Sequence, residues 1–575
     1  MRVKPDIVVF ILGSIFISIS LTNAAIINIP DDFPIIQQGI NASSAGDTVL
    51  VHPGLYIENL RFNIHDITLA SLYLTTEDTS YLSSTIIDGD SSGTVIILES
   101  EGGDNTAIVG LTIQNGYTSD NGGGIYCNWS QADIHHNIIS SNICQLYGGG
   151  IYCSNANIEI HDNVFRYNLA GDGGAIGLDN QSHAHIYNNI ISHNSAMMWQ
   201  GYSRAGAIFC FDRSNPLIHD NTIEYNFGRV TAAISVTFYC QPVITDNILR
   251  YNEAIYCGVI GCSDSDPFIA FNTIAFNTVD SSGGAFFIAG SNPEIVNNVV
   301  YENSSGTQGG AIYSALSSPV FRNNIIINNR AAWNGGAVFI SESSPVFINN
   351  VFSGNEAEGL GGAIYATDGS FLSGINCILW QNTDIDGSEI FLQNGYCDLA
   401  YSCIVGGWPG EGNLDCDPLF RDPGNSDYHL MAAYCGDATD SPCIDRGSPN
   451  CLDSLLDCDW GLGEAHSDMG AYGGGDTSIV SLDGRDDQPW AWDITIYPNP
   501  FNAAAAINFS LSVADNIRGD IYDILGRQVA TVIDDYLYPG YHSVIWRPAN
   551  LGSGQYYLKI HSDHLTVSRK MLYIK

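Results

Sequence analysis

The chain has 575 residues, of which 45% are hydrophobic, and it contains 60 glycines and 30 tyrosines, a composition of ordered β-rich proteins that excludes a disordered chain. Its net charge is −41, and residues 26–489 contain 11 arginines and no lysine. A surface this acidic repels phosphate backbones, which excludes nucleic acid as a partner.

The first 25 residues have the pattern of a secretory signal peptide. Arg2 and Lys4 form a charged start, an apolar run extends from Ile7 to Leu21, and Asn23-Ala24-Ala25 offers a cleavage region. An uncleaved membrane anchor is the alternative interpretation, although the run is short for a membrane span. No other apolar stretch is long enough to cross a bilayer, so we expect no transmembrane segment in the mature chain.

The segment that follows predicts a cap. Residues 34–40 (PIIQQGI) predict a short amphipathic helix with proline in its first turn, and Gly46-Asp47 turns into a strand over residues 48–52. A cap is needed wherever stacked sheets would otherwise end in open edges.

A block of about 26 residues that ends in Gly-Gly-Ala-Ile or a close variant recurs ten times between Asn115 and Asn382. Its central apolar residues are Ile125, Ile151, Ile176, Ile208, Ile234, Ile260, Phe286, Ile312, Val338 and Ile364. A second signature keeps the same period, and its leading asparagines are Asn137, Asn163, Asn189, Asn221, Asn247, Asn272, Asn298, Asn324, Asn350 and Asn376. A fixed period of this length predicts a solenoid.

One coil, Pro216–Val236, shows three short segments of alternating hydrophobicity, around Ile218, Ile223 and Ile234. Three strands per coil, each pairing with its equivalent one coil away, predict a parallel β-helix of triangular section. The two asparagine columns are expected to hydrogen-bond along the stack and to satisfy turn backbone, which is a structural rather than a catalytic role.

One column of turn residues is the candidate ligand site. Asp212 and Asp264 lie two coils apart in it, roughly 9–10 Å at the strand spacing, with Phe238 between them. That separation is near the upper limit for the carboxylate pair of an inverting glycosidase, so these aspartates are the catalytic candidates. The repeat's sole six-residue insertion enters the coil of Asp212 and brings Trp199 and Tyr202 as sugar-stacking residues. The competing interpretation is a solvated turn column on an acidic protein.

Fifteen cysteines occur in a chain with a secretory signal. Cys127, Cys153, Cys210 and Cys262 share one place in their coils and predict buried core thiols. Residues 397–458 hold seven more, for which disulfides between Cys435 and Cys443 and between Cys451 and Cys458 are local candidates with the connectivity left open. The spacings do not repeat as the paired C-x-x-C of a zinc site.

Aspartates cluster in the same irregular region. Asp457, Asp459 and Asp468, with Asp453 close by, are candidate ligands for a structural Ca²⁺, because irregular acidic loops supply the oxygen ligands that this ion prefers. No EF-hand spacing is present.

Residues 490–575 break the repeat after a linker at 477–489. Six alternating segments, at 506–511, 519–523, 528–532, 542–546, 556–561 and 568–573, predict a small immunoglobulin-like β-sandwich. The predicted fold class is therefore all-β, a right-handed parallel β-helix over residues 26–476 followed by this sandwich.

The coils resemble the right-handed parallel β-helix of the pectin-lyase-like superfamily. The resemblance extends to the opening motifs (Ile36-Gln-Gln-Gly-Ile-Asn41, Gly46-Asp-Thr-Val-Leu-Val51) and to closing ones (Asp417-Pro-Leu-Phe420, Ser441-Pro-Cys-Ile-Asp445). It implies the fold and leaves the activity open, since the superfamily includes lyases, hydrolases, epimerases and adhesins.

The C-terminal motifs Tyr497-Pro-Asn-Pro-Phe501, Tyr522-Asp-Ile-Leu-Gly-Arg-Gln-Val529 and Gly552-Ser-Gly-Gln-Tyr-Tyr-Leu558 resemble the type A sorting domain of the type IX secretion system. The resemblance implies that Pro498, Asn499, Pro500 and Gly526 belong to the sorting motif and that the secretion machinery is a partner. It also implies passage through the outer membrane, then release or attachment at the cell surface.

Signatures of known pectate lyases and polygalacturonases are missing from the repeats. We therefore expect an adhesin or glycan-binding scaffold that contacts an extracellular polysaccharide or a host or cell surface. The alternative is a polysaccharide lyase or glycoside hydrolase. Ca²⁺ is the one cofactor that the residues favour.

Overall fold

The computed structural model describes residues 24–62, 66–99, 106–197, 203–453, 456–458 and 461–473, and toward the C-terminus 494–497, 504–511, 515–523, 527–537, 540–548, 551, 554–561 and 566–573. The chain divides into two compact units. The first runs to Ser448 and includes Met469–Ala471; the second comprises Pro449–Asp468 and Tyr472–Lys575. Except for Ala24 and Ala25, the predicted signal peptide lies outside the described residues, as does the predicted linker.

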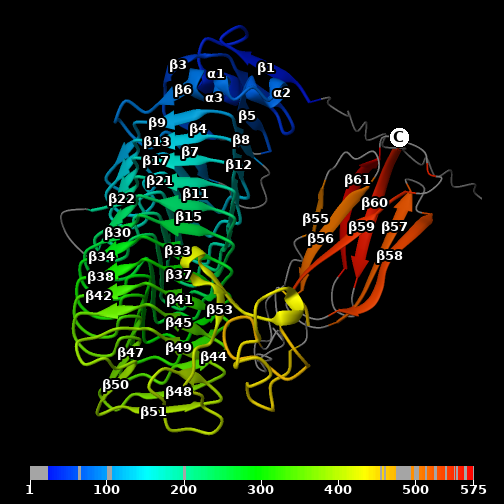
Figure 1. Cartoon of the computed structure of the whole chain (residues 1–575). Helices are drawn as coiled ribbons and strands as arrows, with labels where there is room; N and C mark the ends of the chain where they lie inside the picture. Colours follow the sequence, from blue (N-terminus) through cyan, green and yellow to red (C-terminus); the bar gives the residue numbers. More distant parts are fainter. Residues whose placement is uncertain are drawn as a thin grey trace, which may run out of the picture. The chain divides into compact units, whose positions relative to one another are not determined.

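The first unit is a right-handed β-helix whose coils follow one another from blue to yellow-green in Figure 1. Its described residues form four parallel sheets, which we name A to D. Sheet A contains β1 Ile26–Ile29, β2 Thr48–Val51, β5 Thr68–Ser71, β8 Ala107–Val109, β12 Asp133–His135, β16 Glu159–His161, β20 His185–Tyr187, β24 Leu217–His219, β28 Val243–Thr245, β32 Phe268–Ala270, β36 Glu294–Val296, β40 Val320–Arg322, β44 Val346–Ile348, β48 Phe371–Ile375 and β51 Tyr396–Ala400.

Sheets B and C form the other two long faces. Sheet B contains β3 Gly54–Ile57, β6 Thr85–Asp88, β9 Thr112–Gln114, β13 Ile138–Ser140, β17 Val164–Arg166, β21 Ile190–Ser192, β25 Thr222–Glu224, β29 Ile248–Arg250, β33 Thr273–Ala275, β37 Val299–Tyr301, β41 Ile325–Ile327, β45 Val351–Ser353, β49 Ile378–Trp380 and β52 Cys403–Ile404. Sheet C contains β4 Leu60–Phe62, β7 Ile96–Glu99, β11 Ile125–Asn128, β15 Ile151–Ser154, β19 Ile176–Asp179, β23 Ile208–Cys210, β27 Ile234–Thr237, β31 Ile260–Ser263, β35 Phe286–Ala289, β39 Ile312–Ala315, β43 Val338–Ser341, β47 Ile364–Thr367 and β50 Ile390–Gln393.

Sheet D is an addition to the three strands per coil predicted from the sequence. It contains two-residue strands: β10 Tyr117–Thr118, β14 Ile143–Cys144, β18 Leu169–Ala170, β22 Ser195–Ala196, β26 Phe227–Gly228, β30 Glu253–Ala254, β34 Thr278–Val279, β38 Ser304–Ser305, β42 Arg330–Ala331 and β46 Glu356–Ala357. From β14 onward, each begins just after the second asparagine of its coil, and β10 begins after Gly116, which takes the same place. There the chain stays extended long enough to pair with the next coil. Two residues are too few to show a period in the sequence, so the pattern could not reveal them.

The asparagine columns are hydrogen-bonded ladders, as predicted. Asn247 is buried, and its backbone N–H and its Nδ2 both donate to Oδ1 of Asn272 in the next coil at 3.0 Å. The same Nδ2 donates to the carbonyl oxygens of Ile218 and Thr245. Neighbouring residues repeat this pattern in both columns, so the turns between sheets have their polar groups satisfied inside the protein. The inward aliphatic side chains and the thiols of Cys127, Cys153, Cys210 and Cys262 are buried in one continuous core, also as predicted.

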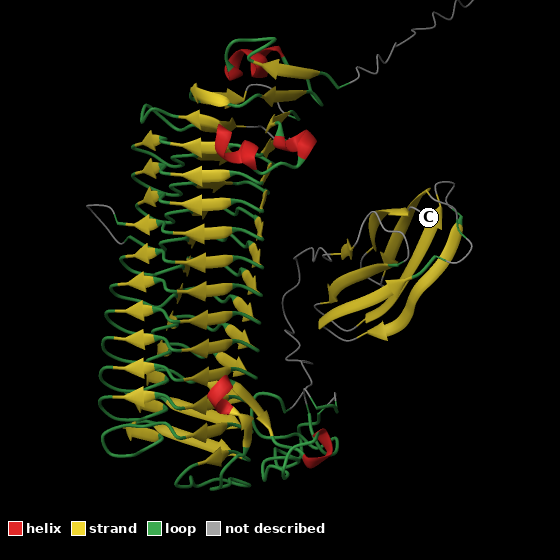
Figure 2. Ribbon diagram, turned by 45° about the horizontal axis from the view of Figure 1, so that its top comes forward, coloured by secondary structure: helices red, strands yellow, loops and turns green. Residues whose placement is uncertain are grey.

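Both ends of the solenoid differ from a regular coil. Helix α1 (Ile36–Ala42) caps the first strands, and α2 (Tyr73–Thr76) and α3 (Ser80–Ser84) follow; these helices are red in Figure 2. At the other end the second ladder stops at Asn382, whose Nδ2 donates to Glu389 at 2.7 Å. The first ladder ends at Asn350, because Cys377 takes the next place in register. Asn376, predicted as a ladder residue, lies instead in the preceding left-handed turn, where its Nδ2 donates to Asn349 and its Oδ1 accepts the N–H of Ser448. The prediction failed at this coil because the chain from β44 to β48 is one residue longer than the chain from β40 to β44. The end region also contains η1 (Pro423–Asn425), η2 (Ala433–Cys435) and the hairpin β53 (Phe420–Asp422) and β54 (Asp427–Leu430).

The second unit contains the predicted small β-sandwich. Among its described residues, β55 (Ile494–Tyr497), β56 (Ala505–Leu511) and β59 (Gly540–Trp546) form one antiparallel sheet. The other contains β57 (Asp515–Asp523), β58 (Gln528–Leu537), β60 (Gly554–His561) and β61 (Thr566–Tyr573). Phe509, Ile521, Leu558 and Met571 are among the residues buried in its core.

We expect Asn247→Ala to destabilise the solenoid by roughly 3 kcal/mol or more, because it leaves the N–H and Nδ2 of Asn221 without the buried oxygen to which they donate. Urea denaturation followed by circular dichroism measures the change. Asn41→Ala is the control, since Asn41 is exposed on α1 and surface changes typically stay within about 0.5 kcal/mol. Equal urea midpoints for the two variants would show that the ladder does not stabilise the solenoid.

Glu389 makes the stability depend on pH. Burial raises the pKa of its carboxyl to about 7, against the hydrogen bonds from Asn382 that lower it. A carboxyl whose pKa is higher in the folded state stabilises the fold below its unfolded value of 4.5, and this contribution is lost as pH rises through about 7. The loss is roughly 3 kcal/mol between pH 4 and pH 8. As the pH rises across this range, the urea midpoint should fall more steeply for the wild type than for Glu389→Gln. Parallel slopes would show that Glu389 does not cause the pH dependence.

Candidate functional site

The predicted ligand column is the turn that follows sheet C. Its members are Trp129, Asn155, Asn180, Asp212, Phe238, Asp264, Gly290, Leu316, Glu342 and Asp368, and all have φ between 42° and 62°. Asn, Asp and Gly adopt this left-handed conformation at least cost, so the backbone alone accounts for the aspartates of the column. Bulky residues are not favoured there, and Phe238 is 48% exposed.

The structure places Asp212 and Asp264 in the predicted order, after β23 and β31, with the coil of Phe238 between them. The carboxylate of Asp212 forms an ion pair with Arg213 at 3.0 Å, and one oxygen of Asp264 lies above Gly290 of the following coil. The phenyl ring of Phe238 packs edge-on against Phe211, with ring centroids 4.9 Å apart. The two carboxylates therefore have different neighbours.

Trp199 and Tyr202 of the insertion lie outside the described residues. Beside the insertion, the guanidinium of Arg204 lies 5.6 Å from the ring centre of Phe209, and its backbone N–H donates to Asp172 at 2.5 Å. Burial raises the pKa of Asp172 to about 6, even though that hydrogen bond lowers it. The residue beside the insertion, Arg204, is therefore held by an aromatic ring and by a partly buried carboxylate.

A row of exposed rings follows sheet B, and the sequence analysis did not single it out. Tyr167, His193, Tyr225, Tyr251 and Phe276 occupy the turn position of five successive coils, and we call them the aromatic row. Each has φ between 55° and 58°. Neighbouring ring centroids are 5.1–5.3 Å apart, and the rings from His193 to Phe276 lie within 21° of parallel.

The equivalent turn after sheet A shows what the backbone prefers. At the same positive φ it carries isolated rings at His136, Phe271 and Tyr401, but mainly Asp and Asn, among them Asp162, Asn188, Asp220, Asp246 and Asn297. Side chains of this kind are the usual occupants of left-handed positions, whereas a bulky residue there costs of order 1–2 kcal/mol. Five rings in succession after sheet B are therefore retained against a local conformational cost, a pattern that points to a function at the surface.

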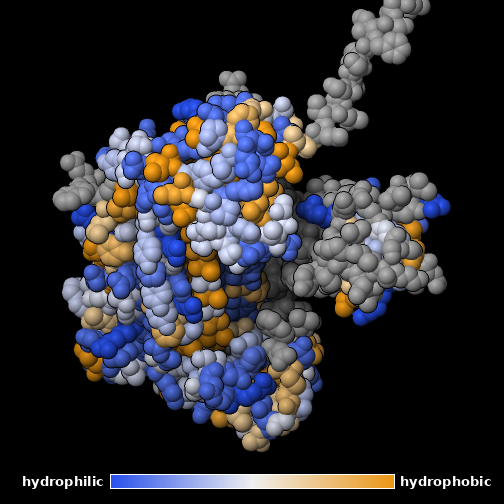
Figure 3. All heavy atoms as spheres, turned by 90° about the horizontal axis from the view of Figure 1, so that it is seen from above, coloured by the Kyte–Doolittle hydropathy of each residue, from blue (hydrophilic) through white to orange (hydrophobic). Residues whose placement is uncertain are grey.

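Polar and apolar groups surround the aromatic row. Arg250 donates to Glu224 at 2.8 Å, and its guanidinium lies 6.0 Å from the ring centre of Tyr251. Ile190 and Ile248 on the adjoining strands are 47% and 41% exposed. In the view of Figure 3, hydrophobic and hydrophilic residues form separate bands on the protein surface. The outer face of sheet B thus combines ring edges, aliphatic groups and hydrogen-bonding side chains.

A second group missed by the sequence analysis lies on the outer face of sheet A. His135, His136, His161, His185 and His219 gather there, and we call them the histidine cluster. The ring of His161 stacks between those of His135 and Tyr187, at centroid distances of 4.8 and 4.7 Å. Asp133, Glu159, Asp162 and Asp220 surround the cluster.

Two neighbouring histidines of the cluster have pKa values that are shifted in opposite directions. Burial disfavours the imidazolium of His161, but its hydrogen bonds to Asp133 and Asp162, at 3.0 and 2.7 Å, outweigh burial and raise its pKa. Burial and the neighbouring imidazoles lower the pKa of His135. Within 5 Å the face therefore holds one imidazole that favours the charged form and one that favours the neutral form.

Both groups follow the asparagine period and were accessible to sequence reasoning. In the histidine cluster, His135, His161 and His219 stand two residues before the leading asparagines of their coils, as Tyr187 does, whereas His185 stands four residues before Asn189 and His136 one before Asn137. The aromatic row stands one residue before the second asparagines. Aligning every column on the asparagines, rather than on the central isoleucine alone, would have shown them. The distances within each group still required the structure.

Three thiols form a further potential metal site. The Sγ atoms of Cys403, Cys416 and Cys443 all lie within 4.8 Å of one another, the only such group of metal-binding side chains among the described residues. A hydrogen bond from the Cys443 thiol is the main cause that lowers the pKa of Cys403, and burial raises that of Cys416 to about 11. Thiolates in this arrangement suit soft metal ions.

The predicted local disulfides are wrong. Cys435 and Cys458 are disulfide-bonded, while Cys443 keeps a free thiol and Cys451 is reduced. Segments distant in sequence come together at the end of the solenoid, so nearness along the chain did not decide which thiols meet.

The predicted calcium ligands are only partly described, since Asp459 lies outside the described residues. Asp468 is buried; its Oδ2 accepts the N–H of Leu462, and its own N–H donates to Asp453. Among the described residues, no three carboxylates that include Asp453, Asp457 or Asp468 bring their oxygens within 4.8 Å of one another. Calcium binding here stays a prediction.

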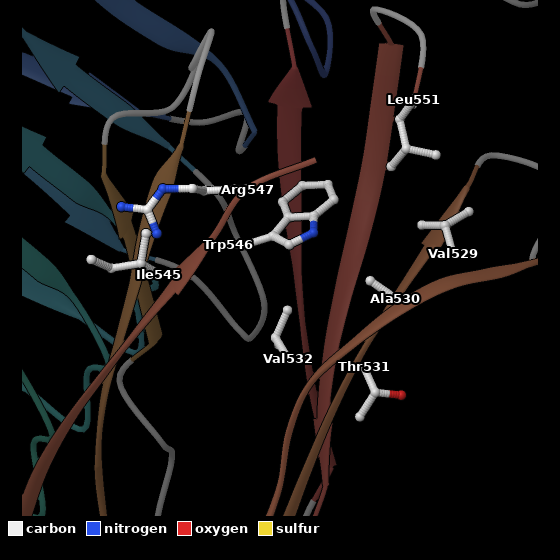
Figure 4. Close-up of a pocket in the computed structure, with 8 residues that line it drawn as sticks. All are labelled: Val529, Ala530, Thr531, Val532, Ile545, Trp546, Arg547 and Leu551. Atoms are coloured by element: carbon white, nitrogen blue, oxygen red, sulfur yellow. The ribbon is translucent and has the colours of Figure 1, made fainter. Parts of the chain in front are cut away.

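The sorting-motif residues Pro498, Asn499, Pro500 and Gly526 lie outside the described residues. The second unit has a pocket of about 440 Å³ lined by eight residues. In Figure 4 the indole of Trp546 on β59 points toward the side of Val529 and Leu551, and Ile545 points the opposite way. Arg547 and Thr531 are the polar residues of this lining.

No helix in the described parts of the chain is long and apolar enough to cross a membrane. Two family models match the chain. One, described as a right handed beta helix region, covers residues 136–285 and 256–399, and the other, a secretion system C-terminal sorting domain, covers residues 495–575. No curated protein matches the sequence. The chain is a secreted or cell-surface right-handed β-helix protein that carries a C-terminal sorting domain of the type IX secretion system.

Proposed function

We propose that the solenoid is an adhesin that binds glycans along the aromatic row of sheet B. The observation that carries the proposal is the occupation of five successive left-handed turn positions by rings that are exposed to solvent. Tyr167, Tyr225, Tyr251 and Phe276 are between 39% and 58% exposed. A contiguous apolar strip of this kind on a soluble surface is typical of an interaction site.

The dimensions of the row suit a polymer. Five coils at the strand spacing give a strip roughly 19 Å long, and the stacked rings present their edges as one continuous surface. Apolar faces of successive sugar units can lie on such a strip while Arg250, Glu224 and Ser192 hydrogen-bond to their hydroxyl groups. A row without a deep pocket fits binding of a chain better than enclosure of one sugar.

The charge of the protein narrows the ligand class. A chain with 61 acidic and 20 basic residues repels polyanions at low and moderate ionic strength. We therefore propose a neutral polysaccharide, rather than a polymer of uronic acids, as the ligand.

We expect the double variant Tyr225→Asn/Tyr251→Asn to weaken binding to neutral glycans by about 10- to 30-fold, because two partly buried rings are lost from the contact. Asparagine tolerates the left-handed backbone, so the fold should persist. A glycan array followed by titration of the best ligand measures the effect. Leu316→Asn is the matched control, since Leu316 has φ of 53° and is 65% exposed outside the row.

The same array includes Phe238→Asn in the turn after sheet C. Loss of binding in this variant, with full binding in the double variant, would move the site to the column of Asp212 and Asp264. Binding unchanged in both variants, or no glycan bound by the wild type, would overturn the proposal.

The alternative function is a polysaccharide-active enzyme that uses Asp212 and Asp264. The observation that favours it is that the two aspartates follow β23 and β31, two coils apart on one turn column. We expect no release of reducing sugars or unsaturated products from neutral or acidic polysaccharides. Turnover that Asp212→Asn or Asp264→Asn abolishes would establish the enzyme instead.

A further inference from the structure

His185 and His219 of the histidine cluster bring two imidazole nitrogens together. The two side chains come from neighbouring strands of sheet A, β20 and β24, and their Nε2 atoms lie 2.6 Å apart. The other ring nitrogen of each histidine faces a carboxylate: Nδ1 of His185 lies 2.9 Å from Glu159, and Nδ1 of His219 lies 2.6 Å from Asp220.

The contact with Asp220 fixes the tautomer of one ring. A carboxylate accepts hydrogen bonds, so Nδ1 of His219 donates to Asp220 and its Nε2 keeps a lone pair. That lone pair faces Nε2 of His185 at 2.6 Å, so a proton on Nε2 of His185 completes the hydrogen bond. A metal ion that displaces this proton would meet two imidazole lone pairs on neighbouring strands.

We propose that His185 and His219 form a binding site for a divalent transition-metal ion of the Cu²⁺, Ni²⁺ or Zn²⁺ class. Neutral imidazole nitrogens suit these ions, whereas Ca²⁺ and Mg²⁺ prefer oxygen ligands. Carboxylates that accept the Nδ1–H of metal-binding histidines are the usual outer partners of such sites. Asp220 occupies this place at His219, and a carboxylate oxygen of Glu159 lies 2.9 Å from Nδ1 of His185.

The geometry allows the ion to enter with small side-chain movements. Two nitrogens bound at 2.0–2.1 Å with a tetrahedral angle are about 3.3 Å apart, so the rings need to separate by less than about 1 Å. The side chains of His185 and His219 are 24% and 15% exposed, so water can complete the coordination. The ring of Tyr187 stacks on His219 at 5.3 Å and restricts its tilt.

Copper titration of the untagged full-length protein tests the proposal. With CuSO₄ we expect one equivalent whose electron paramagnetic resonance spectrum shows two nitrogen ligands, separate from any copper that the thiols of Cys403, Cys416 and Cys443 bind through sulfur. His185→Ala and His219→Ala should each weaken this binding at least tenfold and remove one nitrogen from the spectrum. Glu159→Gln should weaken it by about 10-fold while both nitrogens remain, the result expected of a positioning residue. Excess Ca²⁺ should not compete.

His193→Asn is the matched control, because His193 is an exposed histidine at a left-handed turn outside the cluster. His136→Asn tests the neighbouring pair, in which Nδ1 of His135 lies 2.9 Å from Nδ1 of His136. Far-ultraviolet circular dichroism of each variant verifies the fold. The proposal is overturned if no two-nitrogen copper signal forms, if the signal survives in both His185→Ala and His219→Ala, or if it is lost in the folded His136→Asn protein.

Discussion

Hydrogen bonds between equivalent residues of successive coils are the constraint on which the rest of this structure depends. Except for the last asparagine of each ladder, every member donates to the asparagine one coil further on, and the strands of sheets A to D pair with their equivalents in the next coil. A coil therefore has no freedom to rotate or slide relative to its neighbours. Every surface column inherits this order, so chemically similar side chains repeat at one fixed spacing.

This constraint explains which parts of the molecule the sequence predicted. The asparagine period and the aliphatic positions predicted the solenoid, the buried thiols of Cys153 and Cys210, and the structural role of Asn247. The period ends near Asn382, and there the prediction failed for disulfides, because the meeting of Cys403, Cys416 and Cys443 depends on how irregular loops fold back. Regular repetition carries structural information that irregular segments lack.

The two functional surfaces illustrate a second limit. His161 and Tyr251 occupy positions that the period identifies, yet residue type alone does not separate a functional ring from a packing ring. The decisive observations were the positive φ of the aromatic row and the orientation of the histidine nitrogens toward carboxylates. Both are properties of the backbone and of side-chain geometry, which a periodic pattern does not contain.

The insertion beside Arg204 shows how this architecture can diversify. Strand β19 still pairs with β23 in register, Ile176 opposite Ile208, although the chain between them is six residues longer than in most coils. Loop length is thus uncoupled from strand register, and the energetic cost of a longer loop grows only slowly with its length. New surface loops can accordingly arise by mutation on any coil while the ladders beneath them remain unchanged, so the evolution of binding specificity does not compete with the stability of the fold.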